Sequence, residues 1–457
     1  MRFFLYLMSS IRARFNWSFL LSIFCPLLFF PQLSVATSLT ELYQQALQND
    51  PSFQSVNLQA QIAQEGNRQA LAELLPSVIG AADTSKIGQD IVSSDNTVYS
   101  DGKADYDTTN YSVTLTQPVF RWNSIVGWQQ SKVVQMKAEA EAVVAGQDLI
   151  VRVANLYFQA LAAKDQLDYI LAEQAAVSQF YELAKGRHEM GMIPITDLHD
   201  AKARMAANQA QTIVAKNQLD DALQALSEVT GGTIGEVQPL KNDLKLNSPE
   251  PNNLDNWTDG ALKQNPIIEM QKRAVEAAEL GVKRQKTGHY PSLDLVGSFK
   301  NEDTGGSLFG GGSEIESLEV GLQLTVPFYQ GGGVSSRIRS AYHELDIARQ
   351  NLIQQNRSVL RKTRSAYLGV NSALSQVEAL QESIIANKLA LDAKQEGFMS
   401  GLFTSLNVLD AERDLSLVSI DCAKARYDYI LNSLKLKQAV GSLHEKDLQQ
   451  LEQWFVQ

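Results

Sequence analysis

The histidine and acidic residues are the side chains of this 457-residue sequence that could carry catalytic or metal chemistry. A metal-binding helix needs two histidines one turn apart, and many hydrolases frame their nucleophile as Gly-x-Ser-x-Gly. Neither pattern occurs in the sequence. The nearest two histidines, His188 and His199, are eleven residues apart, which is too far for a pair on one helical turn. The other histidines are His289, His343 and His444. Acidic pairs such as Asp220 and Asp221 are typical of a solvated helix face. The sequence therefore predicts no enzyme, no cofactor and no metal site.

Two further features also argue against specialised chemistry. The glycine-rich stretch 305–312 is not followed by a helix start with Lys-Ser or Lys-Thr, so we predict an exposed turn between strands rather than a phosphate cradle. The two cysteines are too few for a disulfide scaffold or a zinc module. Cys25 lacks the neighbours of a lipid-attachment site, and Cys422 is expected to be buried packing.

Residues 1–36 are typical of a secretory signal peptide. Three arginines make the start basic, residues 18–30 are mainly apolar, and residues 34–36 are small enough for signal peptidase. We therefore expect cleavage after Ala36. A membrane anchor is the alternative, although the apolar run is short for a spanning helix.

The charge of the chain and its hydropathy narrow the class of protein further. The formal charge is -11, and loss of the three arginines with the signal peptide gives -11 - 3 = -14, which argues against nucleic acid as a ligand. No other stretch is long and apolar enough for a spanning helix. The exported chain is therefore either soluble outside the cytoplasm or crosses a membrane as strands.

The elements that would position any site are mainly long helices, and the stretch 142–170 sets their pattern. Its small and apolar residues recur in alternating steps of four and three, a period of about 3.5 residues that is typical of helices wound around each other. The stripe consists of Ala142, Gly146, Leu149, Val153, Leu156, Ala160, Ala163, Leu167 and Ile170. Adding 210 to the numbers from Leu149 onwards gives Val359, Thr363, Ala366, Val370, Ala373, Val377 and Leu380. Two matched helices indicate an internal duplication.

The duplication divides the chain into two copies of one unit. We predict a first repeat over 37–232, a linker over 233–255, a second repeat over 256–442 and a C-terminal tail over 443–457. Each repeat reads as helix, strand, strand, long helix, helix. The long helix of the first repeat is expected over 123–189, or about 100 Å at about 1.5 Å per residue.

Two segments of about ten residues alternate between apolar and polar side chains and predict strands, 110–120 and 318–326. Residues 293–299 are a further strand, and 76–92 are a weaker candidate. The length suits a tilted strand that crosses a bilayer, and the two unlike faces suit lipid on one side and water on the other. A soluble sheet with one buried face is the alternative, but no other part of the sequence looks like a core for it to cover.

Strands that cross lipid must close into a barrel, because an open edge leaves unpaired backbone groups in hydrocarbon. One chain offers four strands, whereas known barrels need about eight or more. The chain must then share its barrel with copies of itself, and the residues alone allow two, three or more.

The chain resembles the family of TolC-like outer-membrane channels of efflux pumps and type I secretion systems. The resemblance covers essentially the whole mature chain and rests on the duplicated unit and on five short motifs. These are Leu-Pro-Ser at 75–77 with Tyr-Pro-Ser at 290–292, Gln-Pro-Val-Phe at 117–120 with Val-Pro-Phe at 326–328, and Asn-Val-Leu-Asp-Ala at 407–411. It implies a mixed, mainly α fold in which long coiled-coil helices form a periplasmic α-barrel. Four transmembrane strands per chain would contribute to a shared 12-stranded barrel in a homotrimer.

The resemblance also implies a function, a location and partners. The chain would be a passive outer-membrane conduit of a Gram-negative bacterium, with its helical part in the periplasm and lipid around its strands. Its partners would be a periplasmic adaptor protein and an inner-membrane transporter of the ABC or RND type. A periplasmic coiled-coil adaptor or scaffold without a pore is the alternative, although no lipoyl-type β-domain is visible between the helices.

The family's functional residues lie at the periplasmic entrance, where two acidic residues one turn apart ring the axis. The matching positions are Asn407 and Asp410, so only the second is acidic here. Three Asp410 carboxylates around a narrow axis would favour cations over anions. A solvated helix face is the alternative from periodicity alone.

The family also latches its closed entrance through an acidic residue that meets an arginine and a tyrosine. Asp197, beside Thr196, matches the acid, but Phe403 stands at the arginine position and Phe398 at the tyrosine position. The ionic latch is therefore absent in that form. We expect apolar contacts of the two phenylalanines to help hold the entrance shut.

The helix–helix turns 190–192 and 400–402 correspond to the tips where adaptor proteins dock in the family. The resemblance assigns this role to Gly191, Met192, Gly401 and Leu402. Glycine at these positions also fits a tight hairpin without any partner.

Overall fold

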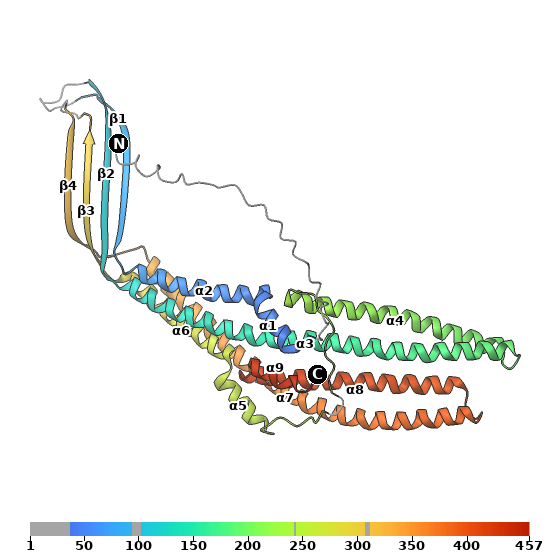
Figure 1. Ribbon diagram of the computed structural model, residues 1–457. Helices are drawn as coiled ribbons and strands as arrows, with labels where there is room; N and C mark the ends of the chain where they lie inside the picture. The colour runs from blue at the N-terminus through green and yellow to red at the C-terminus, as the bar shows by residue number, and fades with distance from the viewer. Residues whose placement is uncertain (1–36, 94–101, 242–243, 307–310, 457) are drawn as a thin grey trace, which may run out of the picture. The chain divides into compact units, whose positions relative to one another are not determined.

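The computed structural model describes residues 37–93, 102–241, 244–306 and 311–456, and the predicted signal peptide lies outside them. The first half contains α1 (Leu39–Asn49), α2 (Pro51–Ala72), β1 (Ser77–Ile91), β2 (Gly102–Arg121), α3 (Trp122–Glu189) and α4 (Ile195–Thr230) (Figure 1). The second half contains α5 (Leu254–Gln264), α6 (Pro266–Lys286), the 3₁₀ turn η1 (Thr287–His289), β3 (Ser292–Thr304), β4 (Ser313–Thr325), α7 (Gly333–Met399), α8 (Ser405–Val440) and α9 (Glu445–Glu452). Among the described residues, none of the helices combines the length and the apolar character that a membrane span requires.

Each half opens with two helices that meet at the same kind of break. Asp50 caps α2 by accepting a hydrogen bond from the backbone N–H of Phe53, and Pro51 occupies the first helical position. In the second half Asn265 caps α6 in the same way, followed by Pro266. Proline has no N–H to lose at this position, so the cap and the proline together fix where the second helix begins.

The long helices follow the predicted 3.5-residue stripe. α3 has 68 residues and α7 has 67, and no member of either stripe is exposed. The polar member, Thr363, is fully buried and donates its hydroxyl to the carbonyl of Val359 at 2.9 Å, which satisfies it within the helix. α3 packs on α4 and α7 packs on α8, and α3 also packs on α8. The two hairpins are thus joined side by side through α3 and α8.

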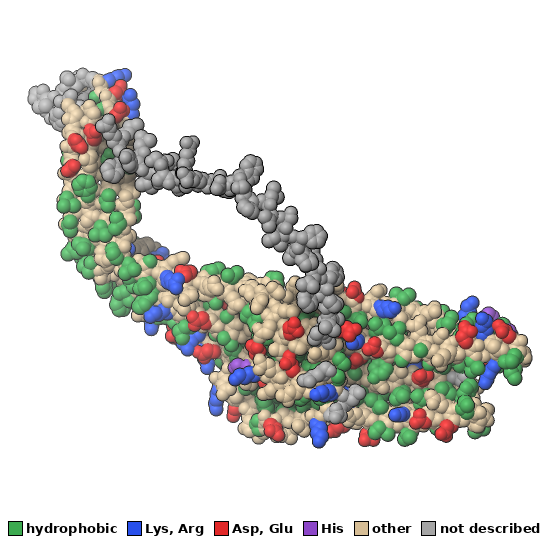
Figure 2. All heavy atoms as spheres, viewed as in Figure 1, with side chains coloured by type: hydrophobic (Ala, Val, Ile, Leu, Met, Phe, Trp, Pro, Cys, Tyr) green, Lys and Arg blue, Asp and Glu red, His purple; other side chains and the backbone are tan. Residues whose placement is uncertain are grey.

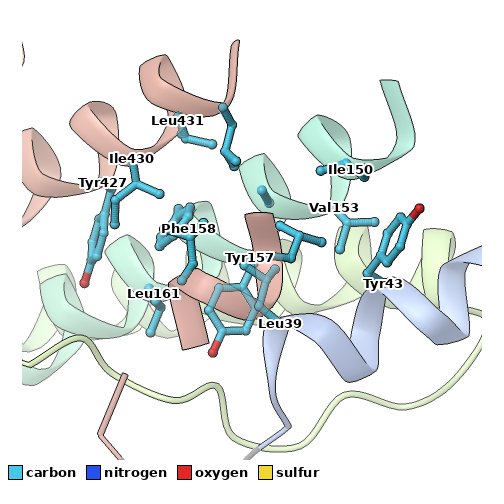
Figure 3. Packing of buried hydrophobic residues seen from close by; sticks show 14 of the residues in the cluster. Leu39, Tyr43, Ile150, Val153, Tyr157, Phe158, Leu161, Tyr427, Ile430 and Leu431 are labelled. Carbon is cyan, nitrogen blue, oxygen red and sulfur yellow. The ribbon is translucent and has the colours of Figure 1, made fainter. Parts of the chain in front are cut away.

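The main hydrophobic core lies where α1, α3, α8 and α9 meet (Figure 3). Tyr157 and Phe158 of α3 are its largest fully buried side chains, and both contact the ring of Phe455 near the C-terminus. The predicted linker enters this core with Val237, and the predicted tail contributes α9. Cys422 is buried, as expected.

The strands form one antiparallel sheet in the order β1-β2-β3-β4, so β1 and β4 are its edges. On one face the rows across the sheet are apolar: Val113 lies opposite Phe299, and Phe299 opposite Leu318. These three side chains are between 42% and 79% exposed, so no layer of the described chain covers this face. Figure 2 shows hydrophobic side chains gathered over the strands. The other face carries polar rows such as Ser112, Lys300 and Ser317.

Two details of the sheet go beyond the predicted segments. β1 is a full strand of 15 residues, and β2 begins at Gly102 rather than at 110. The glycine-rich stretch does lie between strands, since Thr304 at the end of β3 pairs with Ser313 at the start of β4.

Candidate functional site

The candidate site is the end of the two helical hairpins, where α3 turns into α4 and α7 turns into α8. Gly191 and Gly401 adopt the left-handed conformation, with φ of 73° and 78°. In each turn the next residue closes the helix with a backbone hydrogen bond: Met192 N–H donates to Arg187 at 2.9 Å and Leu402 N–H to Gly397 at 2.8 Å. Glycine is needed here because other residues adopt a positive φ at a cost.

The tips expose apolar side chains beside these glycines. Met192 is 69% and Leu402 is 80% exposed, and Met190 and Met399 are comparably open to solvent. Large flexible apolar side chains at a tip are suited to contact with another protein. Whether an adaptor docks at these residues stays a prediction.

Thr196 and Asp197 lie in the first turn of α4 and are exposed. The Thr196 hydroxyl donates to the Asp197 carboxylate at 3.2 Å. An acidic side chain at a helix N-terminus is stabilised by the helix dipole, so this position is explained by the helix itself. Their part in holding the entrance closed stays a prediction.

Asn407 is the third residue of α8 and bonds back to Thr404, the N-cap residue of that helix. Its side-chain oxygen accepts hydrogen bonds from the backbone N–H of Thr404 at 3.0 Å and from the Thr404 hydroxyl at 2.7 Å. The side chain therefore has a local structural task in addition to any task at the entrance.

Asp410 forms an ion pair with Arg204, 3.1 Å from Nη1 to Oδ1. The pair joins α4 to α8 and is half-buried, with side-chain exposures of 38% for Arg204 and 47% for Asp410. Sequence reasoning missed Arg204. A signal was present, because Arg204 follows Asp197 by two helical turns and so lies on the same face of α4.

The two phenylalanines of the expected apolar latch have different surroundings. Phe398 lies under the guanidinium of Arg187, whose central carbon is 5.6 Å from the ring centroid. Phe403 packs on Gly397 of its own hairpin so closely that a side chain at Gly397 would collide with the ring. The contact that crosses between the hairpins is therefore made by Phe398, with an arginine that the sequence did not single out.

Further from the tips, the interface between α3 and α8 contains carboxyl groups whose pKa is raised by burial. The Tyr427 hydroxyl donates to Asp165 at 2.5 Å, and burial nevertheless raises the pKa of Asp165. Burial also raises the pKa of Glu412, and the neighbouring carboxylate of Glu173 raises it further. A groove of about 400 Å³ between α3, α4 and α8 is lined in part by Glu173 and Arg413.

Comparison with known families and sequences gives matches along most of the chain. The model of the family described as "Outer membrane efflux protein" matches residues 42–232 and 257–442. The outer membrane protein TolC of Vibrio cholerae serotype O1 is 31% identical, over 90% of this chain and 92% of that protein. The proteases secretion protein PrtF of Dickeya chrysanthemi is 27% identical, over 92% of this chain and 91% of that protein.

Solved structures share the fold at lower identity. The outer membrane channel CmeC of Campylobacter jejuni superposes with a TM-score of 0.78 at 17% identity, over 91% of this chain and 89% of that one. The outer membrane protein VceC of Vibrio cholerae gives a TM-score of 0.72 at 19% identity, over 89% of this chain and 96% of that one.

Proposed function

Because this chain belongs to the outer membrane efflux protein family, we propose that three copies of it assemble into one duct that is gated at the helical, periplasmic end. The chain is an outer-membrane channel protein that provides an exit duct for efflux and type I secretion.

The sheet is the observation that carries the proposal. It has four strands, two open edges and an apolar face that the rest of the described chain leaves exposed. Such a face is stable in lipid, but open edges are not, so β4 of one copy would have to pair with β1 of the next. Three chains of four strands make a barrel of 12, within the range of known membrane barrels.

The helices of the two repeats, which we place at 37–232 and 256–442, would form the periplasmic wall of the duct. Each copy supplies two helical hairpins, and the long helices α3 and α7 separate the tips of these hairpins from the strands. We propose the entrance at these tips, with Asp410 nearest the axis as a cation-favouring ring and with Asn407 beside it. Thr196, Asp197, Phe398 and Phe403 would hold it closed.

The turn residues Gly191, Met192, Gly401 and Leu402 would receive a periplasmic adaptor protein, which connects the duct to an inner-membrane transporter. The exposed methionine and leucine side chains support this assignment. An ABC transporter would fit a secretion role and an RND transporter an efflux role. Two relatives are named for protease secretion, PrtF and the alkaline protease secretion protein AprF of Pseudomonas aeruginosa.

We further propose that this chain catalyses no reaction and needs no cofactor. The family consists of channel proteins that are in general not enzymes. The alternative of a periplasmic adaptor without a pore lacks support, because the similarity to outer-membrane channels extends over about nine tenths of the chain.

Fractionation and conductance together test this function. The mature protein should partition with the outer membrane, run as a heat-modifiable oligomer and produce discrete conductance steps in a planar bilayer. A soluble monomer whose strands pack on its own helices would refute the proposal.

A further inference from the structure

We infer that Arg204 sets the charge of the entrance and ties its two hairpins together, by pairing with Asp410 of the same chain. The inference rests on the proposed function, because it concerns how the entrance of the duct opens. It adds a residue that the resemblance did not assign.

The ion pair of Arg204 and Asp410 joins the two hairpins. Arg204 belongs to the first hairpin and Asp410 to the second, and their side chains meet at 3.1 Å across 206 residues of sequence. Leu409 and Ala411, on either side of Asp410, are buried and so fix that part of α8. This part of α8 is thus held beside α4, where Arg204 compensates the carboxylate.

A second contact joins the same two hairpins closer to the tips. Arg187 of α3 lies over the ring of Phe398 on α7, at 5.6 Å from the ring centroid. Both arginines come from the first hairpin and both partners come from the second. One contact links α3 to α7 and the other links α4 to α8, so a movement that separates the hairpins must break both.

The charge of the entrance changes when the pair breaks. While Arg204 is in place, each Asp410 is compensated within its own chain, and three copies add no net charge at the axis. When the hairpins separate, three carboxylates lose their partners and form an anionic ring, which attracts cations and repels anions. Arg204 therefore couples opening of the entrance to the exposure of an anionic ring.

The size of the effect follows from the exposure of the pair. An ion pair that is about half exposed changes an equilibrium by a factor of about 2. Three such pairs that open together change the ratio of open to closed channels by about tenfold. Salt weakens exposed pairs, so the open fraction of the natural protein should rise with salt concentration.

The experiment compares purified trimers in planar bilayers under a KCl gradient. Arg204→Gln removes the partner, and Lys202→Gln removes an exposed cation two residues earlier on α4 as the matched control. The double variant Arg204→Asp with Asp410→Arg restores the pair with its charges exchanged. Each variant gives an open fraction and a reversal potential.

We expect Arg204→Gln to raise the open fraction about tenfold and to lose the salt dependence. The reversal potential of its open channels should match that of the natural protein, because the Asp410 carboxylates of an open channel have already separated from Arg204. The exchanged pair should return the open fraction to the natural value, and Lys202→Gln should not change it. If Arg204→Gln behaves like Lys202→Gln while the natural protein conducts, the inference fails and the proposed function stands. If the natural protein forms no conducting oligomer, the proposed function itself fails.

Discussion

Substitution of Asp50 tests how the chain fixes the junction between α1 and α2. The Asp50 side chain is 5% exposed, and one oxygen accepts from the Phe53 N–H at 2.9 Å, the Ser52 hydroxyl at 2.8 Å and the Arg152 guanidinium at 2.5 Å. Asp50→Ala loses the helix cap, which costs about 1 kcal/mol. It also removes the charged partner of Arg152, which keeps its hydrogen bond to the Ser52 hydroxyl at 2.9 Å. This loss costs about 1 to 2 kcal/mol more, because the Arg152 side chain is 40% exposed.

The second repeat supplies a matched control. Asn265 occupies the same position and caps α6 with an amide oxygen, 2.8 Å from the Ile267 N–H, while its amide nitrogen donates to the carbonyl of Ala439. Asp50→Asn should therefore keep the cap and lose only the charge. We expect it to cost about 1 kcal/mol.

Hydrogen exchange measured by mass spectrometry on the detergent-solubilised oligomer reports this local opening. The first turn of α2 should exchange roughly 30- to 150-fold faster in Asp50→Ala and roughly fivefold faster in Asp50→Asn, while α4 is unchanged. Equal exchange in the natural protein and in Asp50→Ala would refute the energetic reasoning. Equal exchange in the two variants would show that the charge, and not the cap, is what matters.

The pH dependence of the same measurement has a definite sign. Burial by itself raises the pKa of Asp50, but hydrogen bonds from Ser52 and Phe53 and the charge of Arg152 outweigh it and lower that pKa below its usual value. A carboxylate with a lowered pKa contributes stability when the pH is above its pKa in the unfolded chain, which is about 3.9. This stability is lost as the pH falls through the pKa of the folded state. The difference between the natural protein and Asp50→Ala should therefore be constant near neutral pH and shrink below about pH 4.

Three further outcomes are expected. Replacing both Phe398 and Phe403 by Ala should raise single-channel conductance, because both rings would be lost from the entrance; unchanged conductance would count against the apolar latch. Burial raises the pKa of Asp165, so the contribution of this carboxyl to stability is present when the pH is below its unfolded pKa and is lost as the pH rises through its folded pKa. Asp165→Asn should therefore raise the thermal midpoint at pH 7 and make that midpoint depend less on pH between about 4 and 7. Met192→Glu with Leu402→Glu should reduce crosslinking to a co-expressed adaptor several-fold while the heat-modifiable oligomer persists, and undiminished crosslinking would place the docking surface elsewhere.

The helices could be predicted because their signal is local. A stripe with a 3.5-residue period records which face of a helix is covered, whatever covers it, and the buried residues of α3 and α7 follow it. The caps were equally readable, since proline after Asp50 and Asn265 marks a helix start in the sequence itself.

The strands were only partly predictable, because alternation is visible only where one face meets lipid. At the start of β2 the positions that continue the apolar face are polar, namely Lys103, Asp105 and Asp107, so the pattern of 110–120 does not extend there. The segment nevertheless pairs with β1 residue by residue. Side-chain contacts across that pairing, such as Asn110 with Asp83 at 3.0 Å, depend on a partner that the sequence of one strand does not specify. The prediction of a ring of unpaired Asp410 carboxylates missed Arg204 for the same reason, since the contact between Arg204 and Asp410 depends on how the two hairpins pack.

The distribution of buried residues supports our proposal that the ends of the hairpins, and not the middle of the chain, are the part that moves. The buried stripe of α3 is dense between Leu149 and Leu167, but beyond Leu167 the rest of that helix buries only Val177 and Ala184. In α7 the last buried residue after Val377 is Gly397, which has no side chain to bury. Each buried aliphatic side chain contributes about 1.5 to 3 kcal/mol, so the outer third of α3 and of α7 is held by far less than the centre. Where burial contributes so little, a few polar and aromatic contacts between hairpins decide the balance, and those contacts are the ones made by Arg187 and Arg204.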